Sequence, residues 1–536
     1  MSRTNNKWGE TMPKTSVLKG FAIAAAVGLL MLPTLADAQN SVLRVRPFGD
    51  LKAIDPIVNS DYMARNHGYM VYDTLFAMDE KLAIKPQMVD TYTTSADGLT
   101  WTFVLRDGLK FHNGAPVTAG DVVASLQRWG QRDGLGQQLF ANTASLTATD
   151  SKTVVLTLKN PWGLVLDALG KPSSNVPFIM PARVASIPAT ESLTDPVGSG
   201  PFIMKKDEWV PGSKVVYVKN PDYKPRSDAT SGMAGAKQAG VDRVEWLYMP
   251  DSQSALNALQ AGEIDIFEEM PPDMLELVAK NQKIKVMPQD TLATQVVFRM
   301  NSLQPPFDNP KVRQAIRYMV DQTTFLRAYV DDPKLYTDCP SFYMCTSPYF
   351  TDAGWVKQDL ARARALIKES GYKGEPVVVL HGTEAGITNT FSSVAEQLMR
   401  DIGLKVEPQA MDWGTLTARR TSKKPMNEGG WSLFISAPTG ADMMDPLGHL
   451  GLRSNCDKAW FGWPCDEQIE KLRAEFAVSP TLEKRKEIAK AIQLRAEETV
   501  PYVPLGQLSL VRGVSTRLSD IPAAAVPVYW NIKKAN

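Results

Sequence analysis

The stretch "TFVLRDGLKFHNGAPVTAGDVV", Thr102–Val123, contains a strand pattern, two turn signals and a helix start in succession. Apolar and polar side chains alternate over residues 99–105, which is the period of a strand with one buried face. The Asp-Gly and Asn-Gly pairs that follow are typical of tight turns. The pattern therefore predicts two strands joined by a hairpin, with a helix after them.

The helix that follows the hairpin carries a capping signal. Thr118 and Asp121 stand three residues apart, the spacing of a capping box that bonds free N–H groups at a helix start. A second alternating pattern, "SKTVVLTLKN", covers residues 151–160 and predicts another strand. Together these patterns indicate a small α+β unit from about residue 79 to about 195.

The second half of the chain has a different organisation. "GEPVVVLHG", "FSSVAEQLMRDIG" and "LKVEPQAMD" predict strand, helix and strand over residues 374–412, a βαβ unit that favours a parallel sheet. Further helices are predicted before Gly262, after Asn309 and over residues 481–499. No Pro/Gly-rich linker separates the two patterns, so we expect interleaved domains.

Composition is that of a soluble globular protein with two or three domains. The chain has 536 residues, of which 44% are hydrophobic and 22% charged. Its formal net charge is +1, and residues 1–38 carry four basic and two acidic side chains, so the remainder is close to −1. A chain this near to neutral gives no electrostatic reason to expect nucleic acid or an anionic membrane as a partner.

The N-terminus has the pattern of a secretory signal peptide. Lys14 and Lys19 precede an apolar run of 12 residues, 21–32, which is too short to span a bilayer comfortably. Small residues at Ala36 and Ala38 then predict cleavage after Ala38. We therefore expect an exported, soluble protein.

Cysteine spacing favours disulfides over metal. Cys339, Cys345, Cys456 and Cys465 permit three full pairings, and the oxidising compartment implied by export favours bonded thiols. The local pairing joins the first two and the last two. The tight C-x-x-C spacing of zinc sites is not present, so we expect no metal.

Motifs of the common enzyme classes are missing from the sequence. The four histidines have no metal-ligand spacing, and there is no G-x-S-x-G elbow or phosphate-cradling glycine loop. We therefore expect no cofactor and no catalytic residues.

Several segments together resemble one family. "TFVLRDGLKFHNGAPVTAGDVV", "VGSGPFIM", "KNPDYK", "ALQAGEIDI", "PPFDNPKVRQAI" and "DMMDP" occur in the order found in solute-binding receptors of the peptide/nickel class of ABC importers. The resemblance implies an α/β fold, a two-lobed clamp with an extra α+β domain inserted in the first lobe. It implies the following boundaries: lobe 1 from 39–78, 199–295 and 506–536, the inserted domain at 79–198, and lobe 2 at 296–505.

The resemblance also implies where a ligand's ammonium group binds. In the family pattern G-W-x-x-D-x-x-D-P, the first acid pairs with that group, and Asp442 takes its place. Asp445 precedes a proline and is interpreted as the cap of a following helix. The chain departs from the pattern at Pro438 and Thr439, which replace the glycine and the tryptophan, so an aromatic wall is lost.

Other candidate ligand contacts follow from the same resemblance. Trp413, in "MDWGTLTARR", matches a tryptophan that lines the cleft, and Arg420 matches an arginine near ligand carboxylates. Ser60 and Tyr62 fall on a cleft-edge strand that pairs with peptide backbone. The aromatic-rich segment 458–465 is either a pocket wall or a separate small core.

The function implied by the resemblance is that of a monomeric periplasmic receptor. It would bind a di- or oligopeptide, or another small amine-bearing solute, and deliver it to a membrane permease. The departure at Thr439 leaves open a receptor for an opine, a sugar or a metal complex. A secreted hydrolase with paired carboxylates is the alternative from another class.

Overall fold

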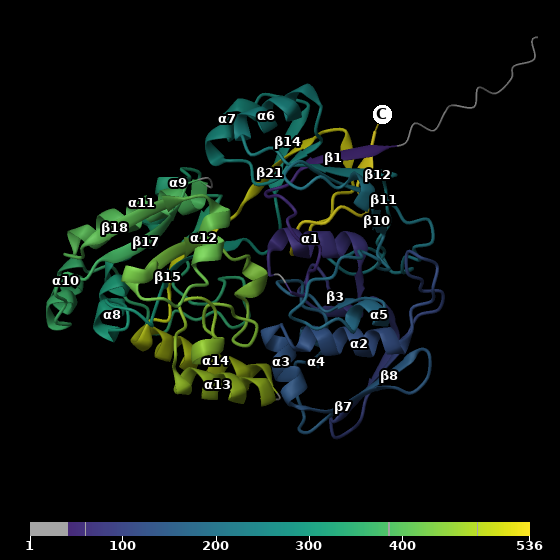
Figure 1. Ribbon diagram of the computed structural model, residues 1–536, viewed down its shortest axis with the longest axis horizontal. Helices are drawn as coiled ribbons and strands as arrows, with labels where there is room; N and C mark the ends of the chain where they lie inside the picture. Colours follow the sequence, from purple (N-terminus) through teal and green to yellow (C-terminus); the bar gives the residue numbers. More distant parts are fainter. Residues whose placement is uncertain (1–40, 59, 384–385, 480, 536) are drawn as a thin grey trace, which may run out of the picture. The chain divides into compact units, whose positions relative to one another are not determined.

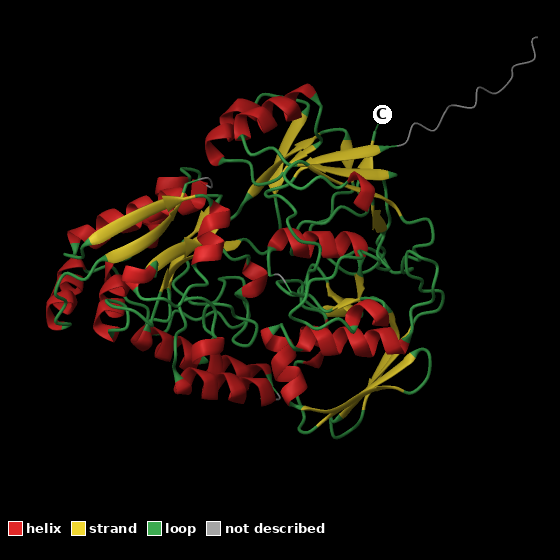
Figure 2. Ribbon diagram, viewed as in Figure 1, coloured by secondary structure: helices red, strands yellow, loops and turns green. Residues whose placement is uncertain are grey.

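The structure is a computed structural model that describes residues 41–58, 60–383, 386–479 and 481–535. The predicted signal peptide, residues 1–38, and its cleavage point lie outside the described residues. Three sheets of four or more strands organise the described chain, and helices pack on each of them (Figures 1 and 2). No helix within these ranges is long and apolar enough to cross a membrane.

The first lobe is built on a seven-stranded sheet. Its order is β10 (Phe202–Met204), β11 (Lys214–Lys219), β12 (Arg243–Leu247), β1 (Val42–Arg46), β13 (Ile266–Phe267), β21 (Val511–Ser515) and β14 (Ile284–Pro288). Strand β1 is parallel to both of its neighbours, whereas the other pairs are antiparallel. Its helices are α1 (Tyr62–Val71), α6 (Ser252–Ala261) and α7 (Leu275–Val278).

The second lobe is built on a six-stranded sheet. Its order is β16 (Tyr336–Thr337), β20 (Val503–Leu508), β15 (Thr294–Met300), β19 (Leu433–Ser436), β17 (Val377–Gly382) and β18 (Val406–Met411). Parallel strands β17 and β18 are joined through α11 (Gly386–Asp401), so the βαβ prediction is confirmed (Figure 1). The other helices are α8 (Pro310–Met319), α9 (Gln322–Tyr329), α10 (Leu360–Glu369), α12 (Trp413–Arg419), α13 (Glu467–Val478) and α14 (Leu482–Thr499).

The inserted domain has a four-stranded antiparallel sheet covered by short helices. Its order is β5 (Val89–Thr94), β6 (Thr100–Leu105), β8 (Thr153–Leu158) and β7 (Thr143–Ala148). The helices are α2 (Ala119–Gly130), α3 (Gly134–Ala141), α4 (Val165–Leu169) and α5 (Ala182–Ala185). Short two-stranded pairs complete the fold: β2 (Asp73–Thr74) with β9 (Phe178–Ile179), β3 (Phe76–Met78) with β4 (Ile84–Pro86), and β22 (Leu518–Ser519) with β23 (Lys533–Lys534).

The predicted hairpin after residue 105 is wrong. Strand β6 forms, but β5 and β8 occupy both of its edges, so the following segment has no free ladder to join. That segment contributes only an isolated bridge, between Lys110 and Pro116. The chain does turn at the Asp-Gly and Asn-Gly pairs. Tertiary contacts, however, determine which strands pair with β6.

Helix starts and ends follow the local signals. Thr118 and Asp121 form both bonds of a capping box at α2, and the Asn309 side chain accepts from the Lys311 N–H at α8. Gly262 ends α6 with φ of +76°, a left-handed conformation that costs glycine little. These predictions are confirmed because a cap depends on neighbours within four residues.

Two connections carry the chain between the two lobes. Residues 289–293 link β14 to β15, and residues 509–510 link β20 back to β21. They lie side by side, since the Gln289 N–H donates to the Leu510 carbonyl at 2.9 Å. Two adjacent connections between lobes are the usual place of a hinge, and these two connections are called the hinge below. The exact boundaries of the three domains stay a prediction.

Candidate functional site

Asp442 lies in the loop that follows β19, a central strand of the second lobe, and beside the hinge. It ends the short 3₁₀ turn Gly440–Asp442, and its side chain is only 4% exposed. The Gly440 N–H donates to the Ala293 carbonyl at 2.7 Å, and the Gln295 N–H donates to the Pro438 carbonyl at 3.0 Å. Backbone bonds therefore fix the position of this carboxylate relative to the hinge strands.

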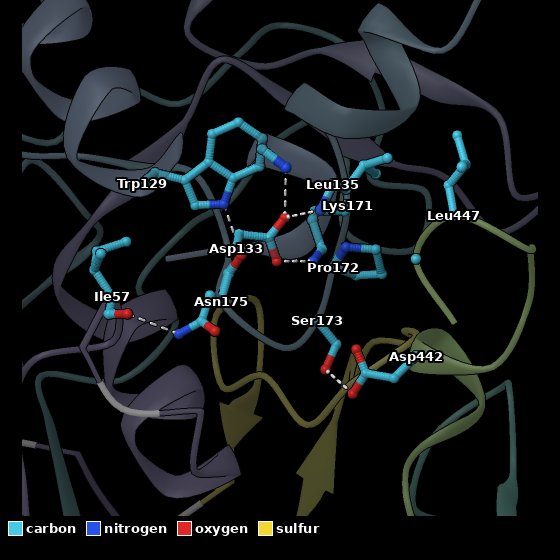
Figure 3. Close-up of polar contacts among 12 residues, drawn as sticks. Ile57, Trp129, Asp133, Leu135, Lys171, Pro172, Ser173, Asn175, Asp442 and Leu447 are labelled. Carbon is cyan, nitrogen blue, oxygen red and sulfur yellow. Dashed lines mark hydrogen bonds and ion pairs between the residues drawn. The ribbon is translucent and has the colours of Figure 1, made fainter. Parts of the chain in front are cut away.

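The Asp442 carboxylate accepts hydrogen bonds from outside its own lobe. The Tyr62 hydroxyl, from α1 of the first lobe, donates to Oδ2 at 2.8 Å. The Ser173 hydroxyl, from the inserted domain, donates to the same oxygen at 3.0 Å (Figure 3). Burial raises the pKa of Asp442, while Lys171 and the Tyr62 bond act to lower it. The carboxylate is therefore a contact point for three parts of the chain.

The segment that carries Ser173 is held by polar contacts on both sides. Lys171 forms an ion pair with Asp133, and the Trp129 indole N–H donates to the Asn175 carbonyl at 2.9 Å (Figure 3). The Arg65 Nη1 donates to the Ser173 hydroxyl at 2.9 Å. These contacts aim the serine at Asp442.

Tyr62 begins a helix rather than extending a strand, which corrects the prediction for this segment. The Asp61 side chain accepts from the Met63 N–H and caps α1, so the chain turns instead of running along a sheet edge. Ser60 is exposed, and no strand in the described ranges includes it. The Tyr62 hydroxyl also accepts from the Thr439 N–H at 3.1 Å. Tyr62 thus contacts the predicted site, but through its hydroxyl.

Arg420 follows α12 and lies among aromatic rings. Its guanidinium carbon is 5.0 to 5.8 Å from the centroids of four rings, those of Trp413, Phe434, Trp460 and Phe461. Burial lowers the pKa of Arg420 to about 10, so it stays charged at neutral pH. Within the described chain it forms no ion pair, and its Nε is buried without a hydrogen-bond acceptor. A cation held in this way is available to an anionic group.

Asp442 and Arg420 both act on the first turn of α1. Tyr62 bonds Asp442 directly, and the Asp61 carboxylate, at the cap of α1, is close enough to Arg420 to raise its pKa. An acidic and a basic side chain of the second lobe thus face the same short segment of the first. The structure brings Asp442, Thr439 and Arg420 near Tyr62, and Trp413 joins this group through its contact with Arg420.

Thr439 has a polar atom with unused bonding capacity. Its backbone N–H donates to Tyr62, but its buried hydroxyl has no partner within the described residues. The hydroxyl stands at the position where the family pattern has tryptophan. It offers a hydrogen-bonding group where an aromatic face was expected.

Asp445 has the capping role predicted for it, but no α-helix follows. Its Oδ1 accepts from the Leu447 and Gly448 N–H groups, both at 2.9 Å. The chain from 446 to 448 forms a turn only. These two local bonds give Asp445 a structural role at the start of the turn.

The disulfides follow the local pairing, Cys339 with Cys345 and Cys456 with Cys465. No cluster of three or more His, Cys, Asp or Glu side chains that could hold a metal ion occurs in the part of the chain that the structure describes. Sequence reasoning missed Ser173, Arg65 and Lys171, which carry no motif. The aromatic segment 458–465, for which two interpretations were open, supplies two rings around Arg420.

Comparison with known proteins identifies the family. A sequence model described as "Bacterial extracellular solute-binding proteins, family 5 Middle" matches residues 83–460. The chain belongs to this family. A relative named "Probable peptide ABC transporter periplasmic-binding protein y4tO", from Sinorhizobium fredii, is 36% identical over 521 residues. That match covers 95% of this chain and 98% of the relative.

Solved structures share the two-lobed fold of this family 5 solute-binding protein. The DppA protein of Helicobacter pylori, solved with the peptide STSA, superposes with a TM-score of 0.79 at 21% identity, over 93% of this chain and 99% of its own. AgaA of A. tumefaciens R10, solved with agropinic acid, gives 0.75 at 23% identity, over 92% and 99%. Their ligands differ in class, so the fold alone does not select a ligand.

Proposed function

We propose that this protein is a monomeric periplasmic receptor of an ABC importer that captures a small zwitterionic solute, a di- or oligopeptide or a similar amine-bearing compound. It releases the solute to a membrane permease and performs no bond chemistry. The relatives of the same family, which are named as binding proteins, support this function. Nucleic acid is not a partner, because the chain is close to neutral.

The observation that carries the proposal is the pair of opposite charges facing the first turn of α1. Asp442 uses Oδ2 for Tyr62 and Ser173, and its Oδ1 accepts no hydrogen bond from the described residues. Arg420 forms no ion pair within the described residues, and its Nε has no acceptor there, although the Asp61 carboxylate is near enough to raise its pKa. A ligand ammonium would form an ion pair with the free oxygen of Asp442, and a ligand carboxylate would form one with Arg420. Ion pairs of this kind are strongest in a site from which water is excluded.

Closure of the lobes would bury the solute. The Tyr62 and Ser173 bonds to Asp442 join parts that the hinge separates, so they form only when the lobes approach. The receptor would thus open at residues 289–293 and 509–510 and close over a bound solute. Domain boundaries near 79, 199, 296 and 506, and removal of residues 1–38 on export, belong to the same proposal.

A second candidate is a receptor for a hydroxyl-bearing solute such as an opine or a sugar. The observation that favours it is the buried, unpartnered hydroxyl of Thr439 beside Asp442. A solute hydroxyl would satisfy this group, which an ordinary dipeptide placed there would leave without a partner.

Native mass spectrometry of the purified protein tests both candidates, because a closed receptor retains its solute and the mass identifies it. Titration calorimetry then measures affinity for that solute in Asp442→Asn, which keeps an oxygen acceptor for Tyr62 but removes the charge. We expect a loss of about 2–5 kcal/mol, the range for removing one partner of a buried charge pair. Asp90→Ala, an exposed acid of β5, is the control. Unchanged affinity in Asp442→Asn would remove this residue from the site, and release of cleaved solute would indicate an enzyme.

A further inference from the structure

The two disulfides close short loops that support different parts of the site. Cys339 and Cys345 are separated by six positions, and Cys456 and Cys465 by nine. Asp442 and Arg420 lie just outside regular elements, the first in a single 3₁₀ turn and the second at the end of α12. Backbone bonds tie the start of the Asp442 turn, residues 438–440, to the hinge. The position of the remaining segments, beyond the ends of regular elements, depends also on what packs behind them.

The loop closed by Cys339 and Cys345 packs behind Asp442. Its Met344 N–H donates to the carbonyl of Met443, the next residue after Asp442, at 3.3 Å. The Phe342 carbonyl accepts from the His449 ring at 2.8 Å, and the Tyr343 ring contacts the same histidine edge-on at 5.9 Å. Both aromatic residues are fully buried. The loop therefore holds both ends of the segment 443–449 through backbone and side-chain contacts.

The loop closed by Cys456 and Cys465 packs against Arg420. Trp460 and Phe461 lie inside it and supply two of the four rings around the guanidinium, at 5.8 and 5.0 Å. Trp460 also contacts Phe434, a third ring of the set, at 5.4 Å between centroids. The disulfide thus closes the loop that carries half of the aromatic surroundings of this cation.

A buried arginine fixes the same loop from behind. The Arg299 side chain is 0% exposed, and its Nε and Nη2 donate to the Phe461 and Trp460 carbonyls at 2.6 and 2.9 Å. Its Nη1 donates to the Gly451 and Pro501 carbonyls. Because all four of these acceptors are backbone carbonyls, this side chain sets the path of the chain rather than balancing a charge.

From these contacts we infer that the disulfides are two separate positioning devices of the ligand site. Cys339–Cys345 positions Asp442, and Cys456–Cys465 positions Arg420 with its aromatic rings. The assignment to ligand ends rests on the function proposed above. Crosslinking the loops in advance lowers the ordering cost when a solute binds, so each disulfide contributes affinity for one end of the solute.

The first test needs no ligand. Hydrogen–deuterium exchange is compared in the wild type, Cys339→Ala/Cys345→Ala and Cys456→Ala/Cys465→Ala, so that each double variant is the control for the other. The first variant should exchange at least tenfold faster over residues 438–450 and be unchanged over 413–422. The second should show the reverse. Equal changes in both regions, or in neither, would overturn the inference, and circular dichroism confirms that each variant is folded.

The second test separates the two ends of the solute. Three probes are titrated: dialanine, N-acetyl-dialanine, which lacks the ammonium, and dialanine amide, which lacks the carboxylate. The Cys339→Ala/Cys345→Ala variant should bind dialanine and its amide at least tenfold more weakly and leave the acetylated form unaffected. The Cys456→Ala/Cys465→Ala variant should bind dialanine and the acetylated form at least tenfold more weakly. It should bind the amide as tightly as the wild type does. Losses that do not depend on the probe would indicate a general effect on folding and contradict the inference.

The two tests also separate this inference from the proposed function. If the wild type binds none of the three probes, the peptide ligand is wrong, but the exchange pattern still decides whether each disulfide holds its own segment. If the wild type binds dialanine and the exchange pattern is the same in both variants, the function stands and the positioning roles fail.

Discussion

Removal of the Tyr62 hydroxyl should weaken closure of the two lobes. This hydroxyl donates to Asp442 Oδ2 at 2.8 Å and accepts from the Thr439 N–H at 3.1 Å, so it forms two bonds across the lobes. Tyr62→Phe removes both bonds and keeps the ring, over which the Arg65 guanidinium lies at 4.4 Å. The variant therefore tests the bonds without opening a cavity.

The size of the effect follows from the two bonds. A hydrogen bond to a charged group contributes about 1.5–3 kcal/mol and a neutral one about 0.5–1.5 kcal/mol. In the open form water replaces both, so the closed form of Tyr62→Phe should be destabilised by about 2–4 kcal/mol. If the solute binds productively to the closed form, this cost appears in the measured affinity. The lower limit, about 2 kcal/mol, corresponds to a loss of about 30-fold.

Titration calorimetry with the solute retained by the purified protein measures this loss. Ser173→Ala should lower affinity less than Tyr62→Phe, because it removes one bond to Asp442 and no bond to Thr439. Tyr92→Phe, on an exposed tyrosine of β5, is the control. An affinity of Tyr62→Phe within about threefold of the wild type would correspond to under 1 kcal/mol and refute the argument.

Two further predictions concern the hinge. Burial and the adjacent Glu268 raise the pKa of Glu269 to about 7, so the folded chain retains a proton there and loses stability as pH rises from about 4.5 to about 7. Glu269→Gln should match the wild type at pH 4.5 and exceed its free energy of unfolding by about 1–3 kcal/mol at pH 8, measured with urea; a difference independent of pH would contradict this. A Cβ at residue 440 would lie 2.2 Å from the Leu292 carbonyl oxygen, so Gly440→Ala should cost about 1–3 kcal/mol in urea unfolding and displace Asp442. Wild-type stability with wild-type affinity for the solute would show that the hinge does not fix that loop.

The parts of the fold that the sequence predicted correctly are those decided by near neighbours. The capping box of α2, the glycine that ends α6 and the βαβ unit of β17, α11 and β18 all depend on residues close in the chain. The hairpin failed because the partners of β6 are β5 and β8, and the choice between them and the next segment is a tertiary one. Sequence patterns indicate where a turn lies, but they do not indicate which of several strands pairs with an edge of β6.

The site was predictable only on its second-lobe side. Asp442, Trp413 and Arg420 stand in segments that resemble the family; the first and last lie near the start of α1, and Trp413 contacts Arg420. Ser173 is 269 positions from Asp442 and lies in a segment with no motif. Its contact exists only because the inserted domain approaches the second lobe, and no local pattern encodes that approach.

The two oxygens of Asp442 explain how binding of a solute and closing of the two lobes reinforce each other. Burial raises the pKa of this carboxyl, so closing the lobes without a solute makes its charged form costly. A solute ammonium at Oδ1 would offset that cost and keep the group ionised. The ionised carboxylate is also the stronger acceptor for the Tyr62 and Ser173 hydroxyls at Oδ2. The bound solute would therefore strengthen the contacts that close the lobes over it, and an empty receptor would favour the open form.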